Sequence, residues 1–402
     1  MRVVSVVPTF PKLSETFIVR KFLGLLERGV DAHVVCNRSD RSVWQQFPEV
    51  DRAPGSRRRV HRVTPVRPRW KPLLGGPIDI ARALATNPGS VWRYGASSGK
   101  RLLLDAPLIR LNSDIVHFEF GALAVGRMHL RELLGSSVVV SFRGYDLNFS
   151  GLDVDGYYDE VWEHADALHF LGRDLWNRAM ARGCPGDKER RLIPPAVDLQ
   201  FWATDRNPSK EVLGTTEHPL RILSVGRLEW KKGYEHALQA IRHLVDDGVV
   251  CRFEILGDGS AFESLAFARH QLGLEKIVQF EGFVSPDRVR ERMKEADVLL
   301  HAAVSEGFCN GVVEAQAMGL PTVVTDADGL PENVADGETG CVVPRRDARR
   351  MAEKLALLAG DADLRSSMSR NARRRAEENF SIDRHIDAFV DLYTDLCKER
   401  ER

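Results

Sequence analysis

Short apolar runs alternate with longer amphipathic stretches along the whole chain. Runs rich in valine, isoleucine and leucine, such as 2–7, 137–142 and 296–301, have the length and composition of buried strands. The stretches between them carry apolar residues at helical spacing, which is typical of helices that pack on one face. Strands and helices that alternate in this way form parallel sheets covered by helices. The pattern therefore predicts an α/β protein.

Glycines and the ends of apolar periodicity mark the expected element boundaries. The pattern predicts a first helix that runs to about Arg28 and stops at Gly29, and helical stretches at 78–86 and 98–112. Further helices are expected from about Tyr234 and from Asn310, and the second of these stops at Gly319. Strands are expected at 2–7, 31–36, 114–118, 137–142, 165–170, 221–225, 252–256, 277–280, 296–301 and 340–343.

The length and composition bound the class of protein. A chain of 402 residues exceeds the size at which one hydrophobic core keeps growing, so two domains of about 200 residues each are expected. The 57 basic and 57 acidic residues balance, which gives no case for a polyanion-binding protein as a whole. The six cysteines are dispersed, without a C-x-x-C pair or zinc-like spacing, and are expected to be reduced thiols of a cytoplasmic protein. No apolar run is long enough for a signal peptide or a membrane span.

A basic segment, 52–71, contains eight arginines and lysines with Trp70 among them. Basic residues beside an aromatic side chain suit an anionic membrane surface or a lipid pyrophosphate. A solvated loop explains the same composition, and the prolines argue against a long amphipathic helix. Peripheral contact with the inner face of the membrane and a plain surface loop both stay open.

Two carboxylates, Glu306 and Glu314, lie eight positions apart across a predicted strand, loop and helix. Ligands of open α/β sheets bind beyond the carboxyl ends of the strands, and a helix start offers free N–H groups to an anion. The loop before Asn310 is therefore a place for a phosphorylated ligand. Glu306 is placed to face a hydroxyl-rich group, whereas Glu314 is within reach of a ribose diol.

A second motif, Gly226-Arg-Leu-Glu-Trp-Lys-Lys-Gly233, follows the predicted strand 221–225. Glycine permits a close backbone approach, and Arg227 with a lysine at the next helix start can converge on a diphosphate. A solvated surface face is the alternative, since charged runs usually have that role. Gly257-Asp-Gly259 is too short to indicate dinucleotide binding by itself, and Asp153-Val-Asp155 in a polar loop favours a turn over a metal site.

The motifs G-R-L-x-x-x-K-G and E-G-F-C-N-G-V-V-E, in this order, resemble the signatures of the retaining glycosyltransferases of family 4, the glycosyl transferases group 1. The opening P-K-L-S-E-T-F is similar to exopolysaccharide glycosyltransferases such as those of the colanic acid pathway. The resemblance implies the GT-B fold, with two Rossmann-like domains whose parallel sheets face each other across a cleft. The implied domains are 1–200, completed by a terminal helix at 380–402 that crosses back, and 201–379.

The resemblance also implies a nucleotide-diphosphate sugar donor, based on UDP or GDP, and neither a metal nor another cofactor. Arg227, Lys232 and Glu306 would then be the catalytic residues, with Lys231 as the alternative to Lys232. The leaving phosphate itself would accept the proton of the acceptor. The residues expected to bind the donor are Gly226, Gly257, Gly259, Phe283, Val284, Phe308, Cys309, Asn310 and Glu314.

The acceptor side is less well defined. Polar residues at the expected strand ends and the first strand–helix loop give the candidates Ser14, His117, Arg143, Tyr145 and Asp146, and S-F-R-G-Y-D resembles the H-G-Y-D turn of the family. Arg143 departs from it, because an arginine stays charged and cannot replace a neutral histidine as a base. Glu119 and Asp328 stand where relatives often carry a histidine and a glycine, and Asp328 is expected to narrow the donor-sugar site.

Several alternatives stay open at this point. The acceptor is expected to be a glycan or lipid-linked oligosaccharide of exopolysaccharide or other cell-surface glycan synthesis, or else a small soluble natural product. A GT-B epimerase or phosphorylase and a non-catalytic nucleotide-sugar binding protein are the other readings of the same cleft. The motifs indicate neither the sugar nor the base.

Overall fold

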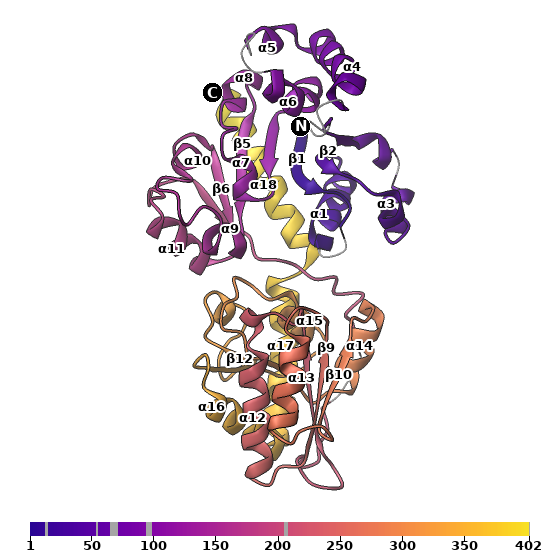
Figure 1. The fold of residues 1–402 in the computed structure, drawn as a ribbon, viewed down its shortest axis with the longest axis vertical. Helices are drawn as coiled ribbons and strands as arrows, with labels where there is room; N and C mark the ends of the chain where they lie inside the picture. Colours follow the sequence, from indigo (N-terminus) through magenta and orange to yellow (C-terminus); the bar gives the residue numbers. More distant parts are fainter. Residues whose placement is uncertain (13–14, 54, 65–70, 94–98, 205–207, 402) are drawn as a thin grey trace. The chain divides into compact units, whose positions relative to one another are not determined.

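Two parallel sheets organise the chain, and each belongs to a unit of its own (Figure 1). The computed structural model describes residues 1–12, 15–53, 55–64, 71–93, 99–204 and 208–401. Unit 1 comprises Met1–Leu171, Leu175–Ile193 and Asp383–Arg402, and unit 2 comprises Gly172–Asp174 and Pro194–Ile382.

The sheet of unit 1 has seven strands among the described residues, in the order β3-β2-β1-β4-β5-β6-β7. Each neighbouring pair is parallel, and Val4 of β1 lies opposite both His33 and Val116. The central strands β4, β5 and β6 are buried along their whole length, as expected for a parallel sheet that helices cover on both faces. The strands are β1 (Arg2–Thr9), β2 (Asp31–Arg38), β3 (Val60–Arg62), β4 (Ile115–Phe118), β5 (Ser137–Phe142), β6 (Ala167–Phe170) and β7 (Arg190–Leu192).

The helices predicted in unit 1 are present, and several short ones were not predicted. The predicted helix at 78–86 begins earlier, at Lys71, and the edge strands β3 and β7 were not predicted, because three residues are too few to show a period. The helices are α1 (Thr16–Glu27), α2 (Arg41–Trp44), α3 (Pro48–Arg52), η2 (Ser56–Arg59), α4 (Lys71–Thr86), α5 (Pro88–Arg93), α6 (Gly99–Leu111), α7 (Gly121–Ala124), α8 (Leu130–Leu134), α9 (Gly144–Asn148), α10 (Asp159–His164), α11 (Arg173–Ala181) and α18 (Ile382–Glu401).

The basic segment 52–71 is partly neutralised within unit 1. Arg57 bonds Asp51 at 2.7 and 2.9 Å, and Arg59 bonds Asp31. Residues 65–70, which include Trp70, lie outside the described residues. Membrane contact through this segment therefore stays a prediction. Among the described helices, none combines the length and the apolar character that crossing a bilayer requires.

A buried polar chain runs through unit 1 beneath the terminal helix α18. His169 donates from Nε2 to the carbonyl of Ile193 at 2.9 Å, so its Nδ1 must accept from Ser141 Oγ at 2.7 Å. Ser141 in turn accepts from His117 Nε2 at 2.7 Å, which leaves His117 Nδ1 to accept from Tyr393 of α18, also at 2.7 Å. The terminal helix is thus tied into the sheet through one directional chain of hydrogen bonds.

The same chain meets a buried ion pair, because Lys21 Nζ lies 3.0 Å from His117 Nδ1. Lys21 Nζ of α1 lies 2.5 Å from Glu119 Oε1 and 4.0 Å from the ring centre of Phe389, and the two charged side chains are 3% and 1% exposed. Burial lowers the pKa of Lys21 to about 8. Burial alone would raise the pKa of Glu119, but Lys21, His117 and Arg143 hold it below its usual value. The pair is therefore charged, and each partner depends on the other because neither reaches water.

The sheet of unit 2 has six parallel strands among the described residues, in the order β10-β9-β8-β11-β12-β13. Five of the six correspond to strands predicted from the sequence, and β12 is the one that was not predicted. They are β8 (Leu220–Val225), β9 (Cys251–Leu256), β10 (Val278–Gly282), β11 (Val298–His301), β12 (Thr322–Thr325) and β13 (Gly340–Val343).

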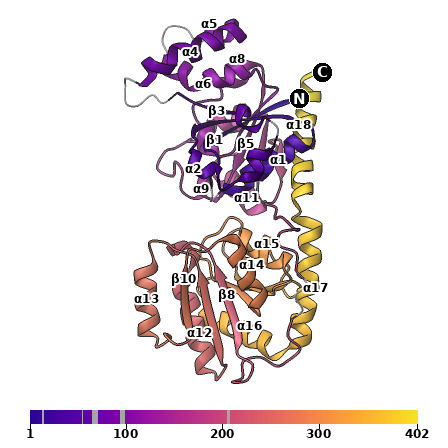
Figure 2. The same cartoon turned by 90° about the vertical axis from the view of Figure 1, so that its right-hand side faces the viewer.

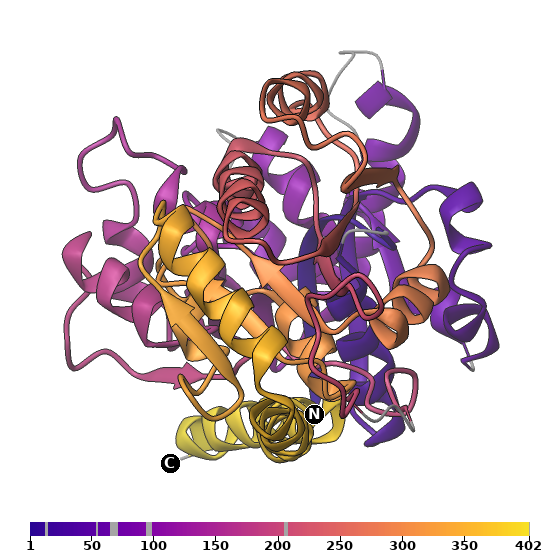
Figure 3. The same cartoon turned by 90° about the horizontal axis from the view of Figure 1, so that it is seen from below.

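Helices cover both faces of this sheet and enclose two apolar cores. One core combines α12, α13 and α16, and in the view from below the rose α12 lies beside the golden α16 (Figure 3). The other combines α14, α15 and α17, and Figure 2 shows α13 and α14 on opposite sides of the strands. The helices are η3 (Trp230–Lys232), α12 (Tyr234–Asp246), α13 (Phe262–Gln271), α14 (Pro286–Glu295), α15 (Asn310–Ala317), η4 (Leu330–Glu332), α16 (Ala348–Gly360) and α17 (Ala362–Asn379).

The Lys21 pair gives a stability prediction. Lys21→Met is expected to lower the free energy of unfolding by about 3–5 kcal/mol, because Glu119 is left as a buried carboxylate without its nearest cation. Urea denaturation followed by circular dichroism measures the change. The double variant Lys21→Met, Glu119→Gln removes both charges and is expected to recover at least half of the loss. Equal losses in the single and double variants would contradict this account.

Candidate functional site

The strand order of unit 2 reverses at β8, which lies between β9 and β11. The chain leaves β8 and β11 in opposite directions at such a switch point, and ligands of open α/β sheets bind in the resulting crevice. Both loops that carry the predicted donor motifs follow these two strands. They are joined directly, since Val304 N donates to the carbonyl of Lys231 at 2.8 Å. The topology therefore brings the two sequence motifs together.

An ion pair connects the two loops at this point. Lys232 Nζ, at the end of η3, donates to Glu306 Oε2 in the loop after β11. The side chains are 13% and 15% exposed, so both charged groups are largely shielded from water. Gly233 follows with a φ of 63°, and a Cβ there would collide with the carbonyl oxygen of Ala302. Glycine thus lets the first loop pack close enough for its lysine to reach the carboxylate.

The two charges hold each other in their ionised forms. Burial alone would raise the pKa of Glu306, but Lys232 and His301 lower it to about 2. Burial alone would lower the pKa of Lys232, but Glu306 and Cys309 raise it above its usual value. Glu306 is consequently an acceptor of hydrogen bonds at any pH near neutrality, and Lys232 is a donor with three N–H groups.

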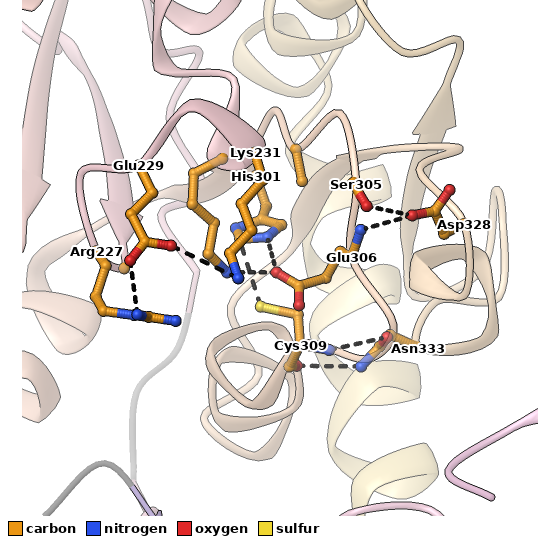
Figure 4. Close-up of polar contacts among 12 residues, drawn as sticks. Arg227, Glu229, Lys231, His301, Ser305, Glu306, Cys309, Asp328 and Asn333 are labelled. Atoms are coloured by element: carbon orange, nitrogen blue, oxygen red, sulfur yellow. Dashed lines mark hydrogen bonds and ion pairs between the residues drawn. The ribbon is translucent and has the colours of Figure 1, made fainter. Parts of the chain in front are cut away.

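His301 and Cys309 complete a compact polar cluster with Glu306, and Figure 4 shows the three side chains turned toward one another. Cys309 Sγ lies 4.0 Å from His301 Nδ1, and His301 Nε2 lies 3.6 Å from Glu306 Oε2. Burial alone would lower the pKa of His301, but the neighbouring thiol and carboxylate raise it to about 8. Burial alone would raise the pKa of Cys309, but His301 and Lys232 lower it.

Asp328, in the loop after β12, fixes the position of the Glu306 loop. Its Oδ2 accepts from Ser305 Oγ at 2.6 Å and from Glu306 N at 3.1 Å, while its Oδ1 lies 3.2 Å from Arg345 (Figure 4). The residue has a φ of 52°, in the left-handed region that favours glycine. The expectation that Asp328 narrows the sugar site is untested, and its carboxylate is used within the loop.

Asn333 likewise fixes the backbone of Cys309 at the start of α15. Its Oδ1 accepts from Cys309 N at 3.4 Å and its Nδ2 donates to Cys309 O at 3.1 Å (Figure 4). Asn333 is fully buried, and its own carbonyl accepts from Gln316 at 2.8 Å. The side chain of Cys309 is thereby held in place at the N-terminus of the helix.

Arg227 does not share a partner with Lys232 in this structure. Its Nη1 lies 2.6 Å from Glu229 Oε1, and its side chain is 65% exposed. Lys231 lies 3.6 Å from the other oxygen of Glu229. The expected convergence of Arg227 and Lys232 on one anion is therefore not preformed. Because Arg227 is exposed and has a long, rotatable side chain, it can still turn toward such an anion.

The glycines of the neighbouring loop allow its backbone to pack directly against the backbone of the first motif loop. A Cβ at Gly257 would collide with the carbonyl oxygen of Gly226, and one at Gly259 with that of Leu228. After β10, Phe283 is 81% exposed, whereas Val284 packs against the core beside α14 and α15. The exposed ring of Phe283 is available to a planar ligand, and its expected contact with a base stays a prediction.

The remaining donor candidates lie on or just before α15. Phe308 packs edge-on against Phe380 at 5.8 Å, so its ring belongs to the core and only its backbone is placed to contact a ligand. Asn310 is exposed at the first turn of α15, and Glu314 lies one turn further along, half-buried. The N-terminus of this helix offers the N–H groups and partial positive charge expected there.

The acceptor candidates in unit 1 have different environments. Arg143 lies over the ring of Phe17 at 4.0 Å, donates from Nε to the carbonyl of Glu119 at 3.3 Å and is largely buried. Tyr145 is exposed and stacks on Phe149 at 5.6 Å. Ser14 lies outside the described residues. Tyr145 thus presents an open aromatic face, whereas Arg143 is anchored from several sides.

His117 and Asp146 are buried and use their polar atoms within unit 1. His117 is 0% exposed and belongs to the hydrogen-bonded chain under α18. Asp146 accepts from the backbone N–H groups of Ala122 at 3.1 Å and Arg143 at 3.0 Å, so it caps the turn before α9. As placed, both side chains are engaged within unit 1, and their expected contacts with an acceptor stay predictions.

Sequence reasoning missed three residues that shape the cluster: His301, Asp328 as an anchor, and Asn333. His301 ends a buried strand and directly precedes the loop of Glu306, which is the signal that could have found it. Asp328 lies 22 residues from Glu306 and Asn333 lies 24 residues from Cys309, and no spacing rule links them.

Comparisons with known proteins find similar glycosyltransferases and the same fold. Residues 205–375 match the family model of the glycosyl transferases group 1. The chain is 28% identical to the putative colanic acid biosynthesis glycosyltransferase WcaL of Escherichia coli, over 92% of this chain and 94% of the relative. It is also 28% identical to the amylovoran biosynthesis glycosyltransferase AmsK of Erwinia amylovora, over 98% and 97%. The crystal structure of Anabaena HepE with UDP and glucose shares the fold, with a TM-score of 0.72, 15% identity and 98% and 100% coverage.

The anchoring role of Asp328 is open to a direct test. Asp328→Ala is expected to lower the free energy of unfolding by about 1–3 kcal/mol, because Ser305 and the N–H of Glu306 lose their acceptor. Asp328→Gly loses the same bonds but relieves the left-handed backbone, so it should be more stable than the alanine variant by about 1 kcal/mol. Thermal and urea unfolding compare the two. An alanine variant as stable as the parent protein would contradict the anchoring role.

Proposed function

We propose that this chain, which has the GT-B fold and matches the glycosyl transferases group 1 over residues 205–375, is a retaining transferase of that group that uses a nucleotide-diphosphate sugar. Its acceptor would be a hydroxyl of a growing exopolysaccharide or another cell-surface glycan. The observation that carries the proposal is the Lys232–Glu306 ion pair, which joins the two motif loops at the switch point of the unit 2 sheet. The fold expected from the sequence, with two parallel-sheet α/β units, is confirmed.

The charges of the site suit a diphosphate next to a sugar. Lys232 has three N–H donors and uses one on Glu306, so the same ammonium can also contact a phosphate oxygen. The N-terminus of α15 adds partial positive charge, and the exposed Arg227 can rotate from Glu229 toward the same anion. Glu306, ionised and acceptor-only, would bind hydroxyl groups of the sugar, and Glu314 would bind the ribose diol.

The proposed reaction requires mainly that the protein stabilises the diphosphate leaving group. As the bond from the anomeric carbon to the phosphate oxygen breaks, negative charge grows on the diphosphate, where Lys232, Arg227 and the α15 start would offset it. The acceptor oxygen would attack from the same face, and its proton would pass to the leaving phosphate oxygen. In this scheme the protein supplies position and charge, and no side chain has to act as nucleophile or base.

The nature of the acceptor rests on the relatives. WcaL and AmsK, which are named for colanic acid and amylovoran biosynthesis, align with more than nine-tenths of this chain, so their likeness extends through unit 1. The exposed Tyr145–Phe149 pair offers a flat aromatic surface of the kind that packs on sugar rings. The proposed place of action is the cytoplasm, with the basic segment 52–71 as the candidate for contact with the inner face of the membrane.

Donor turnover gives the first test of the proposal. Purified protein mixed with UDP-, GDP- and ADP-sugars is expected to hydrolyse one donor slowly, and nuclear magnetic resonance should show the anomer of the donor appearing first. Glu306→Gln and Lys232→Met are expected to lower this rate by about 10²–10³-fold, since each removes a contact of the developing charge or the sugar. Glu263→Gln, an exposed carboxylate on α13, is the matched control and should keep the parental rate.

Each alternative function predicts a different outcome of this donor experiment. The opposite anomer would exclude retention, and conversion of a donor to its epimer would favour an epimerase. Binding without turnover, even when candidate acceptors are added, would favour a nucleotide-sugar binding protein. Transfer to a small soluble alcohol but not to a glycan would replace the polysaccharide acceptor.

Glu314 should behave differently from Glu306. A ribose contact stabilises the bound donor and the transition state equally, so Glu314→Gln is expected to raise the KM for the donor about tenfold with little change in kcat. Steady-state kinetics with the donor identified above measures both constants. A fall in kcat with an unchanged KM would place Glu314 near the reacting bond and would contradict the ribose assignment.

A further inference from the structure

We infer that His301, Glu306 and Cys309 form a binding site for a thiophilic divalent cation such as Zn²⁺, and that the bound cation blocks the donor site. The family resemblance implies no metal, and the six cysteines show no zinc-like spacing. The spacing His301, Glu306, Cys309 matches none of the familiar zinc motifs, and only the fold brings these side chains together. The binding stands on the geometry alone, whereas the blocking effect rests on the proposed function.

The three ligand atoms lie close enough for one ion. Each residue offers one atom, and all three atoms lie within 4.8 Å of one another. Zinc bonds are about 2.3 Å to sulfur and about 2.0–2.2 Å to nitrogen or oxygen, so ligand atoms around a tetrahedral zinc are about 3–4 Å apart. The observed 4.0 Å between Cys309 Sγ and His301 Nδ1 already falls at that limit. A contraction of about 1 Å or less completes the site.

The kinds of atom select the class of cation. A thiolate, an imidazole nitrogen and a carboxylate oxygen suit Zn²⁺ and similar ions, whereas Mg²⁺ and Ca²⁺ prefer oxygen alone. His301 is 4% exposed, and its Nε2 has no hydrogen-bond partner among the described residues. Its contact with Glu306 Oε2 at 3.6 Å is an ion pair too long for a hydrogen bond, so this buried nitrogen can take a cation as its partner instead.

The surroundings hold the three residues in place. Asn333 binds both backbone groups of Cys309, Asp328 binds the N–H of Glu306, and His301 is fixed by the ladder of β11. Such outer partners orient metal ligands and raise their affinity. Three protein ligands leave a fourth position for water, which is the arrangement of zinc sites that are not purely structural.

Lys232 is the natural competitor of the metal. Its ammonium contacts the same Glu306 oxygen and raises the local positive potential, so a cation can enter only when Lys232 turns away. Two anionic ligands balance a divalent ion better than one ammonium does. The bound ion would then remove Glu306 from the sugar and would leave Lys232 without its partner. Occupancy and donor binding are therefore expected to exclude each other.

Titration of the metal-free protein with Co²⁺ tests the binding without any substrate. The expected result is a thiolate-to-cobalt charge-transfer absorption with the visible bands of a tetrahedral site, both removed by Zn²⁺. Cys309→Ser should abolish the charge-transfer band, and His301→Gln should weaken binding at least about tenfold. Lys232→Met should instead strengthen binding, because the competing ammonium is gone. Cys341→Ser, which removes a buried thiol on β13, should change nothing.

The stronger cobalt binding expected of Lys232→Met tests the site even if Cys309→Ser or His301→Gln folds poorly. Circular dichroism checks that each variant is folded. A charge-transfer band that survives Cys309→Ser, or that shows no strengthening in Lys232→Met, would overturn the site. So would the absence of a band in the parent protein. Zn²⁺ should also inhibit donor hydrolysis reversibly, with relief by a chelator. Cobalt binding without such inhibition would overturn the blocking effect alone, and a protein that binds cobalt but turns over no donor would overturn the proposed function alone.

Discussion

The shielded contact between the Lys232 ammonium and the Glu306 carboxylate is the interaction on which the site of unit 2 depends. Each charge loses most of its water, and each would be costly to bury without the other. The pair forms only because Gly233 permits the first loop to press against the backbone of the second. Asp328, Asn333 and the end of β11 then fix the second loop from its other sides. The geometry of this one ion pair thus depends on the positions of four separate segments of the chain.

The sequence was sufficient for most of the fold. Buried parallel strands leave long runs of branched apolar residues, and every predicted strand is present. The edge strands β3 and β7 escaped prediction because each has three residues, half exposed, and their pairing depends on the neighbouring strand and not on their own composition. The resemblance to the glycosyl transferases group 1 is confirmed, and both motif loops follow the carboxyl ends of strands, β8 and β11.

The side-chain partners of the site were harder to predict. Lys232 and Arg227 belong to one motif, yet a glycine turn sends the first toward Glu306, whereas the second meets Glu229 two residues away. Asp328 was expected to crowd a sugar because it replaces a glycine, but its carboxylate bonds the loop of Glu306. Such pairings depend on rotamers and on contacts between distant segments, about which local patterns carry no information. Lys21 illustrates the same point, because a lysine on an amphipathic helix is expected to face water and not a buried carboxylate.

The terminal helix α18 has a consequence for the order in which the protein is built. Its Phe389 and Tyr393 cover Lys21 and His117, which belong to the first third of the chain. A ribosome makes all of unit 2 between the body of unit 1 and this helix. The half of the protein that emerges first is therefore completed last, and until then its buried ion pair is open to water on one side. Unit 2, whose segments are nearly continuous, can finish folding in the meantime.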